Sequence, residues 1–283
     1  MIRKTGNDLS AFGLYAPGGP AALLLALTRR CTDSWAGRRR AFFLRDLAVR
    51  LLAGRPLDVE AFGARMRLYP YNNVCEKRIL FTPQFFDAAE RALIAARMRS
   101  DFVFLDIGAN IGGYTLFSAA IAGPGARILA VEPQPDIYER LVYNIRQNDF
   151  PGIKAVECAL ADRDGEITLF IDPANHGATS MRIVAAEGRG GQLKVRAKAL
   201  LSLTGEENLT RIDAMKLDVE GAEDLILEPF FAEAPQNLWP RLLLIENDRE
   251  GAGGTLNVVL ARCGYAQVLR TGNKIAYELS APP

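Results

Sequence analysis

The sequence predicts an α/β fold built on a Rossmann-like, doubly wound and mostly parallel sheet of seven strands. The last strand is expected to be antiparallel, and a helical N-terminal extension precedes the sheet. From residue 101 onward, apolar segments of strand length alternate with segments of helical periodicity. The first strand runs directly into a glycine-rich turn and a helix. With 283 residues, 49% of them hydrophobic, the chain can bury one large core.

The first strand of the sheet is expected at residues 102–107. Its apolar residues lead into Asp106, and Gly108 and Gly112 follow before a helix expected at 113–122. Glycine leaves room where a ligand and the backbone approach each other closely. The N-terminus of the helix offers open N–H groups to an anion. Because ligands of open α/β sheets bind at the carboxyl ends of the strands, this turn predicts a site for a nucleotide-like ligand.

The alternation of strands and helices continues to the C-terminus, with one interruption. The interruption covers residues 161–211, and we expect two strands in it, at 166–171 and 193–197, separated by a glycine-rich loop at 188–191. The regular part predicts strands at 127–132, 153–158, 214–218 and 241–246, helices at 136–148, 222–231 and 255–263, and a closing pair of strands at 267–269 and 275–279.

The residues before the sheet contain several shorter elements. Residues 1–20 are rich in Gly and Pro and are expected to be loose. A helix is expected to end at about Ala53 and to begin at a cap formed by Thr32, Asp33 or Ser34. Further along, the sequence predicts short strands at 64–69 and 77–81 around a turn at 70–73, and then a helix at 85–98.

A second acidic residue, Glu132, ends the second strand, where a carboxylate can bind both hydroxyls of a ribose. Dinucleotide sites favour G-x-G-x-x-G, whereas this chain has D-x-G-x-x-x-G. Asp106 would repel a pyrophosphate but can attract a cationic amino group. S-adenosylmethionine carries an amino group and a ribose, so it is the preferred ligand. An NAD(P)-dependent oxidoreductase and a non-catalytic cofactor-binding or scaffold protein remain alternatives.

Four motifs resemble those of the FkbM-type S-adenosylmethionine-dependent methyltransferases, in order and in spacing. They are Asp106–Gly112, Glu132–Pro135 with Leu141, Asn144 and Asn148, Ala159–Leu160, and Met215–Glu223, which is similar to K-x-D-x-E-G-x-E. The resemblance covers about Arg65 to Glu246. It implies a class I methyltransferase fold, and an enzyme that methylates a hydroxyl of a sugar, glycan or polyketide-like metabolite. The cofactor contacts it implies are Asp106, Gly108, Ala109, Asn110, Gly112, Tyr114, Thr115, Glu132, Pro133, Ala159, Leu160 and Asp218.

The resemblance also suggests how the chain is divided. We expect an N-terminal helical extension at residues 1–63 and a methyltransferase domain at 64–283. Within that domain we expect a cap at 64–100, a core at 101–283 and an insertion at 161–211.

Methyl transfer to a hydroxyl calls for a group that takes up its proton. The candidates are Asp218 and Glu220 at the end of the fourth core strand, with Lys216 on the same face of the strand. Asp218 is preferred, in contact with the cofactor, the acceptor or both. A Lys216–Glu220 ion pair that only braces the site is the alternative. The single histidine, His176, lies in a polar segment at 172–181 and is either a surface residue or a lid residue that reaches the acceptor.

A divalent metal is possible at the same edge of the sheet but is not favoured. Methyltransferases of the catechol type bind magnesium with acidic and amide residues at two strand ends, and Asp218, Glu246 and Asn247 could supply similar oxygen ligands. The FkbM resemblance carries no such requirement. The family more often has a histidine near that glutamate, and Asn247-Asp248 departs from this pattern. The metal ligands are therefore left unassigned.

Charge and composition restrict the partners. Residues 1–100 contain 17 Lys and Arg and 8 Asp and Glu, so this part is basic and the remainder is acidic. A basic patch of this kind can hold a nucleic acid, an anionic membrane surface or a phosphorylated substrate, or it can be a solvated helix face docked on the acidic domain. A nucleic acid is not expected, because no aromatic-interleaved basic groove or known reader motif accompanies the charge. We therefore expect a small-molecule or glycan acceptor.

The cysteines and the apolar runs bear on location. Four widely spaced cysteines suit neither a zinc site nor a disulfide scaffold, and we expect reduced, mostly buried thiols in a cytoplasmic protein. No run approaches the roughly 20 apolar residues that span a bilayer. The early apolar run at 21–27 lacks the context of a signal peptide.

Overall fold

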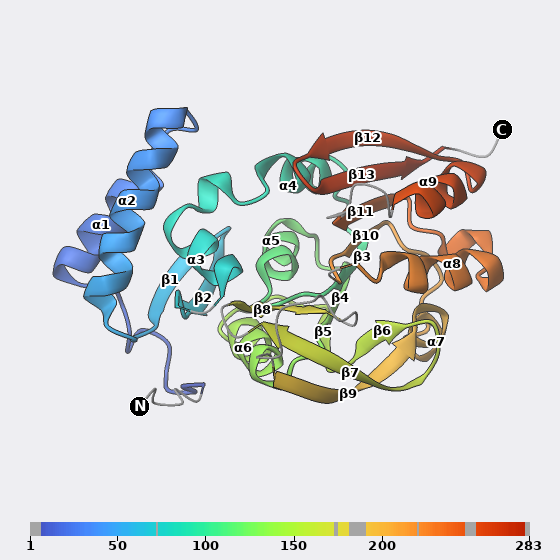
Figure 1. Cartoon of the computed structure of the whole chain (residues 1–283), viewed down its shortest axis with the longest axis horizontal. Coiled ribbons are helices and arrows are strands. Elements are labelled where there is room, and N and C mark those ends of the chain that lie inside the picture. The colour runs from blue at the N-terminus through green and yellow to red at the C-terminus, as the bar shows by residue number, and fades with distance from the viewer. Residues whose placement is uncertain are drawn as a thin grey trace.

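The structure, a computed structural model of the full chain, describes residues 7–71, 73–172, 175–180, 191–219, 221–246 and 253–280. For 171–172, 175–180, 191 and 253–255 it describes the backbone alone. Its main sheet has seven strands in the order β12-β13-β11-β10-β3-β4-β5 (Figure 1). Their bounds are β3 Val103–Ile107, β4 Arg127–Val131, β5 Ile153–Val156, β10 Ala214–Leu217, β11 Leu242–Glu246, β12 Tyr265–Thr271 and β13 Lys274–Leu279.

The strand directions confirm the predicted fold class. β3 pairs in parallel with β4 and β10, and β4–β5 and β10–β11 are also parallel pairs. β13, the last strand, is antiparallel to both β11 and β12. Because the order runs outward from β3 in both directions, the carboxyl ends of β10, β3 and β4 lie side by side at one edge of the sheet.

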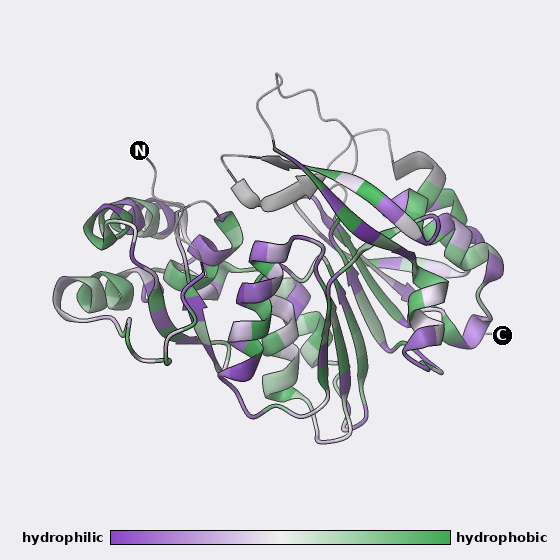
Figure 2. Ribbon diagram, turned by 90° about the horizontal axis from the view of Figure 1, so that it is seen from below, coloured by the Kyte–Doolittle hydropathy of each residue, from purple (hydrophilic) through white to green (hydrophobic). Residues whose placement is uncertain are grey.

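Helices cover both faces of this sheet, which is the doubly wound arrangement. Successive residues of β3 alternate between the two hydrophobic cores, since Phe104 packs with Leu116 of α5 and Leu105 packs with Leu227 of α8. Figure 2 shows the mostly hydrophobic strands between the two helical layers. One layer contains α5 (Gly113–Ile121) and α6 (Pro135–Arg146), and the other contains α7 (Leu200–Glu206), α8 (Glu223–Glu233) and α9 (Gly253–Arg262).

The segment that interrupts the alternation forms a second sheet. Its four strands follow the order β6-β9-β7-β8. The two strands predicted here exist and are longer than expected, but the polar segment around His176 is a strand, β8, where a loop was expected. The prediction was wrong because β8 pairs with β7 through its backbone, which its polar sequence does not reveal. The bounds are β6 Ala159–Ala161, β7 Gly165–Asp172, β8 Asn175–Ser180 and β9 Gly191–Ala199.

Two helices, α1 (Gly19–Arg29) and α2 (Trp35–Leu52), lie side by side at one end of the molecule (Figure 1). The predicted cap of α2 is confirmed, because Ser34 Oγ accepts a hydrogen bond from Gly37 N at 3.1 Å. The helix ends at Ala53, which adopts a left-handed conformation with φ of 49°.

The described residues before α1 are less loose than expected. The buried guanidinium of Arg67 donates to both carboxylate oxygens of Asp58, at 2.7 and 2.8 Å. It also donates to the carbonyl oxygens of Asp8, Ser10 and Ala11. This N-terminal segment supplies hydrogen-bond acceptors that a buried arginine needs, and such a long-range partnership leaves no local sequence signal.

The cap contains a hairpin and two helices. The hairpin strands β1 (Leu57–Ala61) and β2 (Ala64–Leu68) pair across the boundary expected between residues 63 and 64. The strand expected at 77–81 is instead helical, as part of α3 (Val74–Phe81). Its consecutive buried residues Ile79, Leu80 and Phe81 mimic a buried strand, whereas the cap at Asn73, which accepts from Glu76 N, shows the helix start.

The helix expected at 85–98 is shorter in the structure. A 3-10 turn, η1 (Pro83–Phe85), comes first, and α4 covers only Ala88–Ala95. Between them, Asp87 adopts a left-handed conformation with φ of 42°.

Two expectations from composition can be compared with the structure. Of the four cysteines, Cys158 is buried and the other three are partly exposed, so the expectation of mostly buried thiols was wrong. In the part of the chain that the structure describes, every helix is too short or too polar to cross a bilayer.

Candidate functional site

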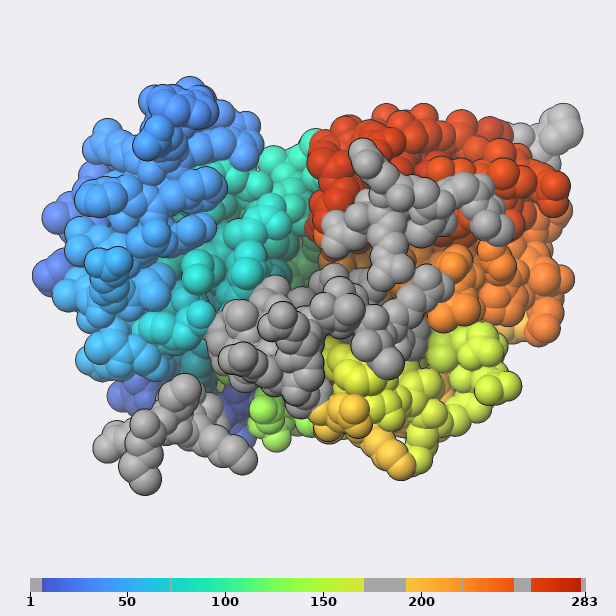
Figure 3. Space-filling view, in the orientation of Figure 1, coloured from blue at the N-terminus to red at the C-terminus, as the bar shows by residue number. Residues whose placement is uncertain are grey.

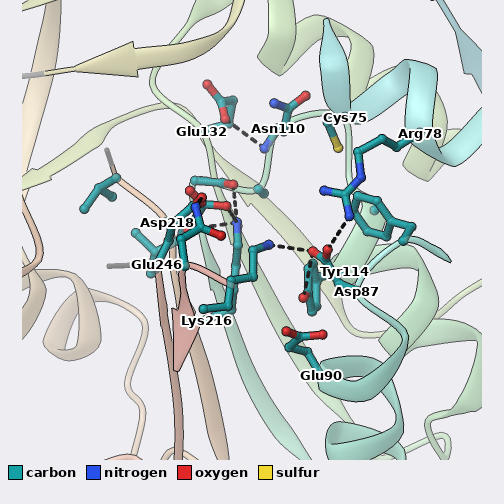
Figure 4. Close-up of a pocket in the computed structure, with 18 of the residues that line it drawn as sticks. Cys75, Arg78, Asp87, Glu90, Asn110, Tyr114, Glu132, Lys216, Asp218 and Glu246 are labelled. Carbon is teal, nitrogen blue, oxygen red and sulfur yellow. Dashed lines mark hydrogen bonds and ion pairs between the residues drawn. The ribbon is translucent and has the colours of Figure 1, made fainter. Parts of the chain in front are cut away.

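A cavity of about 700 Å³ opens at the carboxyl ends of β3, β4, β10 and β11. The glycine turn after β3 forms its floor, and the cap and the β12–β13 turn form its sides. In Figure 3 a hollow separates the cap, in cyan, from the last two strands, in red. Figure 4 shows the side chains that point into it. The cavity therefore lies at the edge of the sheet where the sequence predicts a ligand.

The glycine turn places the backbone of β3 against the end of β10. Gly108 has φ of 70°, and a Cβ at this position would lie 2.0 Å from the carbonyl oxygen of Asp218. The amides of Gly108 and Ala109 both donate to Val131 O at 2.9 Å, which ties the turn to β4. Only glycine allows the turn and Asp218 to approach so closely.

Glu132 is buried where β4 ends. Its Oε2 accepts from Asn110 N at 2.9 Å and its Oε1 accepts from Gln134 N at 3.0 Å (Figure 4). Burial raises the pKa of Glu132 to about 7, against the opposing effect of these hydrogen bonds. Each carboxylate oxygen keeps a lone pair for a further donor, as the predicted contact with ribose hydroxyls requires.

Asp106 lies behind the wall of the cavity. Its Oδ2 accepts from Thr115 N at 2.9 Å and from Thr115 Oγ1 at 2.6 Å, so it joins β3 to the first turn of α5. Asp106, Gly112 and Thr115 are not among the residues that line the cavity. The lining does include the other cofactor residues named from the sequence: Gly108, Ala109, Asn110, Tyr114, Glu132, Pro133, Ala159, Leu160 and Asp218.

Lys216 braces the glycine turn. Its Nζ donates to Gly108 O at 2.6 Å and lies 3.5 Å from Asp106 Oδ1 and 3.3 Å from Asp218 Oδ2. Burial opposes the charge, but the carboxylates of Asp218 and Asp106 raise the pKa of Lys216 above its usual value. A permanently protonated amine is a poor base. The alternative ion pair with Glu220 cannot be compared, because Glu220 lies outside the described residues.

Asp218 shares a hydrogen bond with Glu246, the residue that ends β11. Burial would raise the pKa of Asp218, but Lys216, this hydrogen bond and Lys274 together hold it well below its usual range. Two carboxyl groups can share a hydrogen bond only if one of them is protonated. The low pKa keeps Asp218 ionised, and Glu246 also accepts a hydrogen bond from Asn273.

A group of charged residues from the cap completes the site, and sequence reasoning missed it. Asp87 Oδ1 lies 2.7 Å from the guanidinium of Arg78, and its Oδ2 lies 2.5 Å from Lys274 Nζ. The hydroxyl of Tyr114 also donates to Asp87, at 3.1 Å (Figure 4). Burial would raise the pKa of Asp87, but Lys274 and Arg78 keep it below its usual value. These contacts connect the cap to α5 and β13.

Several candidates cannot be placed. His176 lies in β8, where only the backbone is described, and Asn247 and Asp248 lie outside the described residues. The roles suggested for them, and for Glu220, remain predictions. Among the residues that are described, no group of three or more His, Cys, Asp or Glu side chains could hold a metal ion.

Comparison with known proteins gives one family. Residues 106–265 match the family described as the methyltransferase FkbM domain. Methyltransferase sdnD of Sordaria araneosa is 31% identical over 177 residues, which cover 53% of this chain and 65% of that protein. The 31-O-demethyl-FK506 methyltransferase FkbM of Streptomyces tacrolimicus is 25% identical over 191 residues, which cover 58% and 71%. The chain thus matches about two thirds of the length of these relatives.

A solved structure also resembles this chain. The METTL16 MTase domain superposes with a TM-score of 0.51 at 15% identity, over 92% of this chain and 91% of that one. At this identity the likeness concerns the fold alone.

Proposed function

The chain belongs to the FkbM methyltransferase family, and from this premise we propose that it is an S-adenosylmethionine-dependent O-methyltransferase. Its acceptor would be a hydroxyl of a sugar, glycan or polyketide-like metabolite. The observation that carries the proposal is the pair of carboxylates on either side of the glycine turn, Glu132 after β4 and Asp218 after β10. Glu132 suits the ribose hydroxyls of such a donor, and Asp218 suits its cationic methionyl end.

The residues of the cavity fit S-adenosylmethionine. Glu132 would accept hydrogen bonds from the ribose hydroxyls, and Ala159 and Leu160 would pack against the base. Asp218, which stays ionised, would attract the cationic methionyl end. The bound donor supplies an electrophilic methyl group on a sulfonium. The ionised carboxylate of Asp218 would repel the pyrophosphate of a dinucleotide, so the oxidoreductase alternative has less support.

Asp218 would also orient the acceptor. A hydroxyl that donates a hydrogen bond to this carboxylate is held with its oxygen lone pair free to attack. Because the pKa of Asp218 is low, it is a weak base, and it would take the proton only as the new bond makes the oxygen acidic. Positioning of the acceptor hydroxyl would then contribute more to the rate of methyl transfer than removal of its proton does.

The acceptor would occupy the outer part of the cavity, away from Glu132. This part is lined by Arg38 at the start of α2, Phe85 of the cap and Asn273 of the β12–β13 turn. Arg38 pairs with Asp33 and stacks over the Phe85 ring at 5.2 Å. An acidic group on the acceptor could replace Asp33 as the partner of Arg38, which fits the expectation of an anionic acceptor.

Binding measurements test the proposal directly. Calorimetric titration with S-adenosylmethionine, S-adenosylhomocysteine, NAD and NADP should give saturable binding of the first two alone. Transfer of a labelled methyl group to hydroxylated sugars and polyketides should then identify the acceptor class. Binding of NAD without binding of S-adenosylmethionine would overturn the proposal. Binding of the donor with no transfer to any acceptor would favour the non-catalytic alternative.

A further inference from the structure

The outer face of α2 exposes an unusual set of large apolar side chains. Trp35 is 73% exposed, Phe43 71%, and Leu47 and Leu51 50% each. Phe43, Leu47 and Leu51 follow one another at intervals of four, so they lie along one line of the helix. We call these four residues the α2 stripe. Contiguous exposed apolar surface of this kind marks a binding site for another apolar surface.

The α2 stripe is not needed to attach the helix to the rest of the protein. The opposite side of α2 packs through Ala41, Ala48 and Leu52, which are buried. The helix therefore has a second face, on which apolar side chains and arginines are interspersed, that the described fold leaves uncovered.

Arginines lie among the residues of the stripe, and Arg39 stacks over the Trp35 ring at 4.8 Å. α2 contains five arginines and one acidic residue, Asp46. Asp46 pairs with Arg45, and Arg38 pairs with Asp33. The other three, Arg39, Arg40 and Arg50, are exposed and lie within ion-pair distance of no carboxylate in the described part of the chain. The occupant of this face should therefore carry negative charge beside an apolar region.

Three kinds of occupant can be compared with this chemistry. A second copy of the chain, docked through the same face, would bring two sets of unpaired arginines together. A nucleic acid would use the arginines and could stack on Trp35, but it would leave Leu47 and Leu51 uncovered. An anionic bilayer satisfies both features, because acyl chains accept aromatic and leucine side chains while headgroups pair with arginine.

We propose that the outer face of α2 binds the surface of an anionic phospholipid membrane. The helix would lie in the plane of the headgroups, with the α2 stripe directed toward the acyl chains and Arg39, Arg40 and Arg50 paired with phosphates. Asp33 and Arg38, at the start of the helix, line the cavity. Arg38 projects from the side of α2 opposite the stripe, so docking would hold the cavity about one helix diameter, roughly 10–12 Å, from the headgroups.

Vesicle binding of the full-length protein tests this proposal. Vesicles of phosphatidylcholine with about 30% phosphatidylglycerol should sediment with the protein, and vesicles of phosphatidylcholine alone should bind it much more weakly. Raising the salt from about 0.1 M to about 1 M should release it, because the Debye length falls from about 10 Å to about 3 Å. The fluorescence of Trp35 should shift to the blue on binding, and Trp35→Phe should lose that shift.

Two sets of variants separate the contribution of the apolar side chains to membrane binding from that of the arginines. Phe43→Ala with Leu47→Ala should abolish the blue shift, and Arg39→Gln with Arg40→Gln and Arg50→Gln should weaken binding by about fivefold per residue. The controls remove equivalent side chains elsewhere. They are Leu225→Ala with Val258→Ala, and Arg163→Gln with Arg262→Gln and Arg270→Gln, all exposed and outside α2.

Several results would overturn the proposal. One is equal binding to neutral vesicles, and another is weakening by the control variants to the same extent. Dimerisation that is lost in Phe43→Ala with Leu47→Ala would identify a second copy as the occupant. Tight binding of a single-stranded oligonucleotide that the arginine variants abolish would identify a nucleic acid instead. None of these outcomes depends on methyltransferase activity.

Discussion

Glu132 keeps free lone pairs on both carboxylate oxygens although each already accepts a backbone hydrogen bond. Replacing Glu132 by Ala removes these acceptors and leaves the glycine turn in place. We expect S-adenosylmethionine binding to weaken by about 2–4 kcal/mol, measured by calorimetry. Glu233→Ala, an exposed change at the end of α8, serves as the control and should bind normally. Undiminished affinity in Glu132→Ala would contradict the assignment.

The ionisation of Glu132 predicts how donor binding depends on pH. Burial raises its pKa to about 7 without a ligand. Hydroxyl donors favour the ionised form, so the protonated form must lose its proton before the donor binds. Affinity should therefore be constant above pH 8 and fall by about tenfold from pH 8 to pH 6. Glu132→Gln should bind weakly but without this dependence, and a flat wild-type profile would be inconsistent with a raised pKa.

The paired carboxyl groups predict opposite results from two similar substitutions. Asp218→Asn removes the charge that faces Lys216 and Lys274, and we expect turnover to fall by about 10²-fold or more. Glu246→Gln retains a side chain that can donate a hydrogen bond to Asp218, so turnover should change by only a few-fold. Initial rates at saturating donor and acceptor measure both effects.

Other outcomes for these variants would assign the group that accepts the proton differently. If Glu246→Gln loses as much turnover as Asp218→Asn, the carboxyl group of Glu246 also contributes to the reaction. If Asp218→Asn and Glu220→Gln both lose only a few-fold, His176 becomes the leading candidate.

At the level of single residues, local motifs predicted much of the site, and long-range contacts were missed. The residues at the ends of β3, β4 and β10 line the cavity because strand–turn–helix patterns show where strands end. Asp87 and Lys274 were missed, since 187 residues separate them and only the folded chain brings them together. The available signal was Asp87 before α4, which resembles a helix cap, but its side chain makes no capping bond.

At the level of elements, periodicity predicted the main sheet well and the cap poorly. All seven strands of the main sheet were predicted, because each is a short apolar run bounded by turn residues. α3 was predicted as a strand because three consecutive buried residues look the same in either structure. β8 was missed because edge pairing satisfies its backbone without requiring alternating apolar residues.

The glycine turn is the element whose geometry is most sensitive to substitution. In Gly108→Ala the new Cβ would lie 2.0 Å from Asp218 O, so the turn or the end of β10 must move. We expect donor affinity to fall by more than tenfold and stability to fall by about 2–4 kcal/mol. Gly264→Ala is the matched control, since its φ of 84° is also positive but no atom lies within 4 Å of the added Cβ.

Comparing Gly108→Ala with Gly264→Ala separates the cost of backbone strain from the cost of the contact between the new Cβ and Asp218 O. Both variants carry the cost of alanine at positive φ, about 1 kcal/mol. Only Gly108→Ala should also lose donor binding in calorimetry. Equal losses of stability in the two variants, with binding retained, would show that the turn tolerates a side chain.

At the scale of the whole molecule, the N-terminal segment, the cap and the core form one connected structure. Arg67 of β2 contacts the carbonyl oxygens of the N-terminal segment, and its guanidinium stacks over the rings of Tyr15 and Tyr143, at 4.8 and 4.6 Å. Tyr143 belongs to α6 of the core. Composition predicted a basic N-terminal part, but it did not predict the buried Arg67, which contacts both this segment and α6 of the core.

Arg67→Met tests this attachment. The arginine side chain is 1% exposed, and its loss would leave the equally buried Asp58 without its cation. We expect the free energy of unfolding to fall by about 3–5 kcal/mol in urea denaturation, because a buried charge loses its partner. Limited proteolysis should also cut within residues 7–18 faster than in the wild type, since their carbonyl oxygens lose a donor.

The control for this prediction lies on the same strand. Arg65 is two residues away with a side chain that is 60% exposed, and its ion pair with Glu60 spans 3.9 Å at the surface. Arg65→Met should therefore change stability by about 0.5 kcal/mol or less, and it should change proteolysis far less than Arg67→Met does, since Arg65 meets the N-terminal segment through a distant ring contact with Phe12 at 5.9 Å. If the two variants unfold at the same urea concentration, Arg67 is not what holds the N-terminal segment. The hydrogen bond from Arg140 to Asn7, at 2.8 Å, would then be the contact to test next.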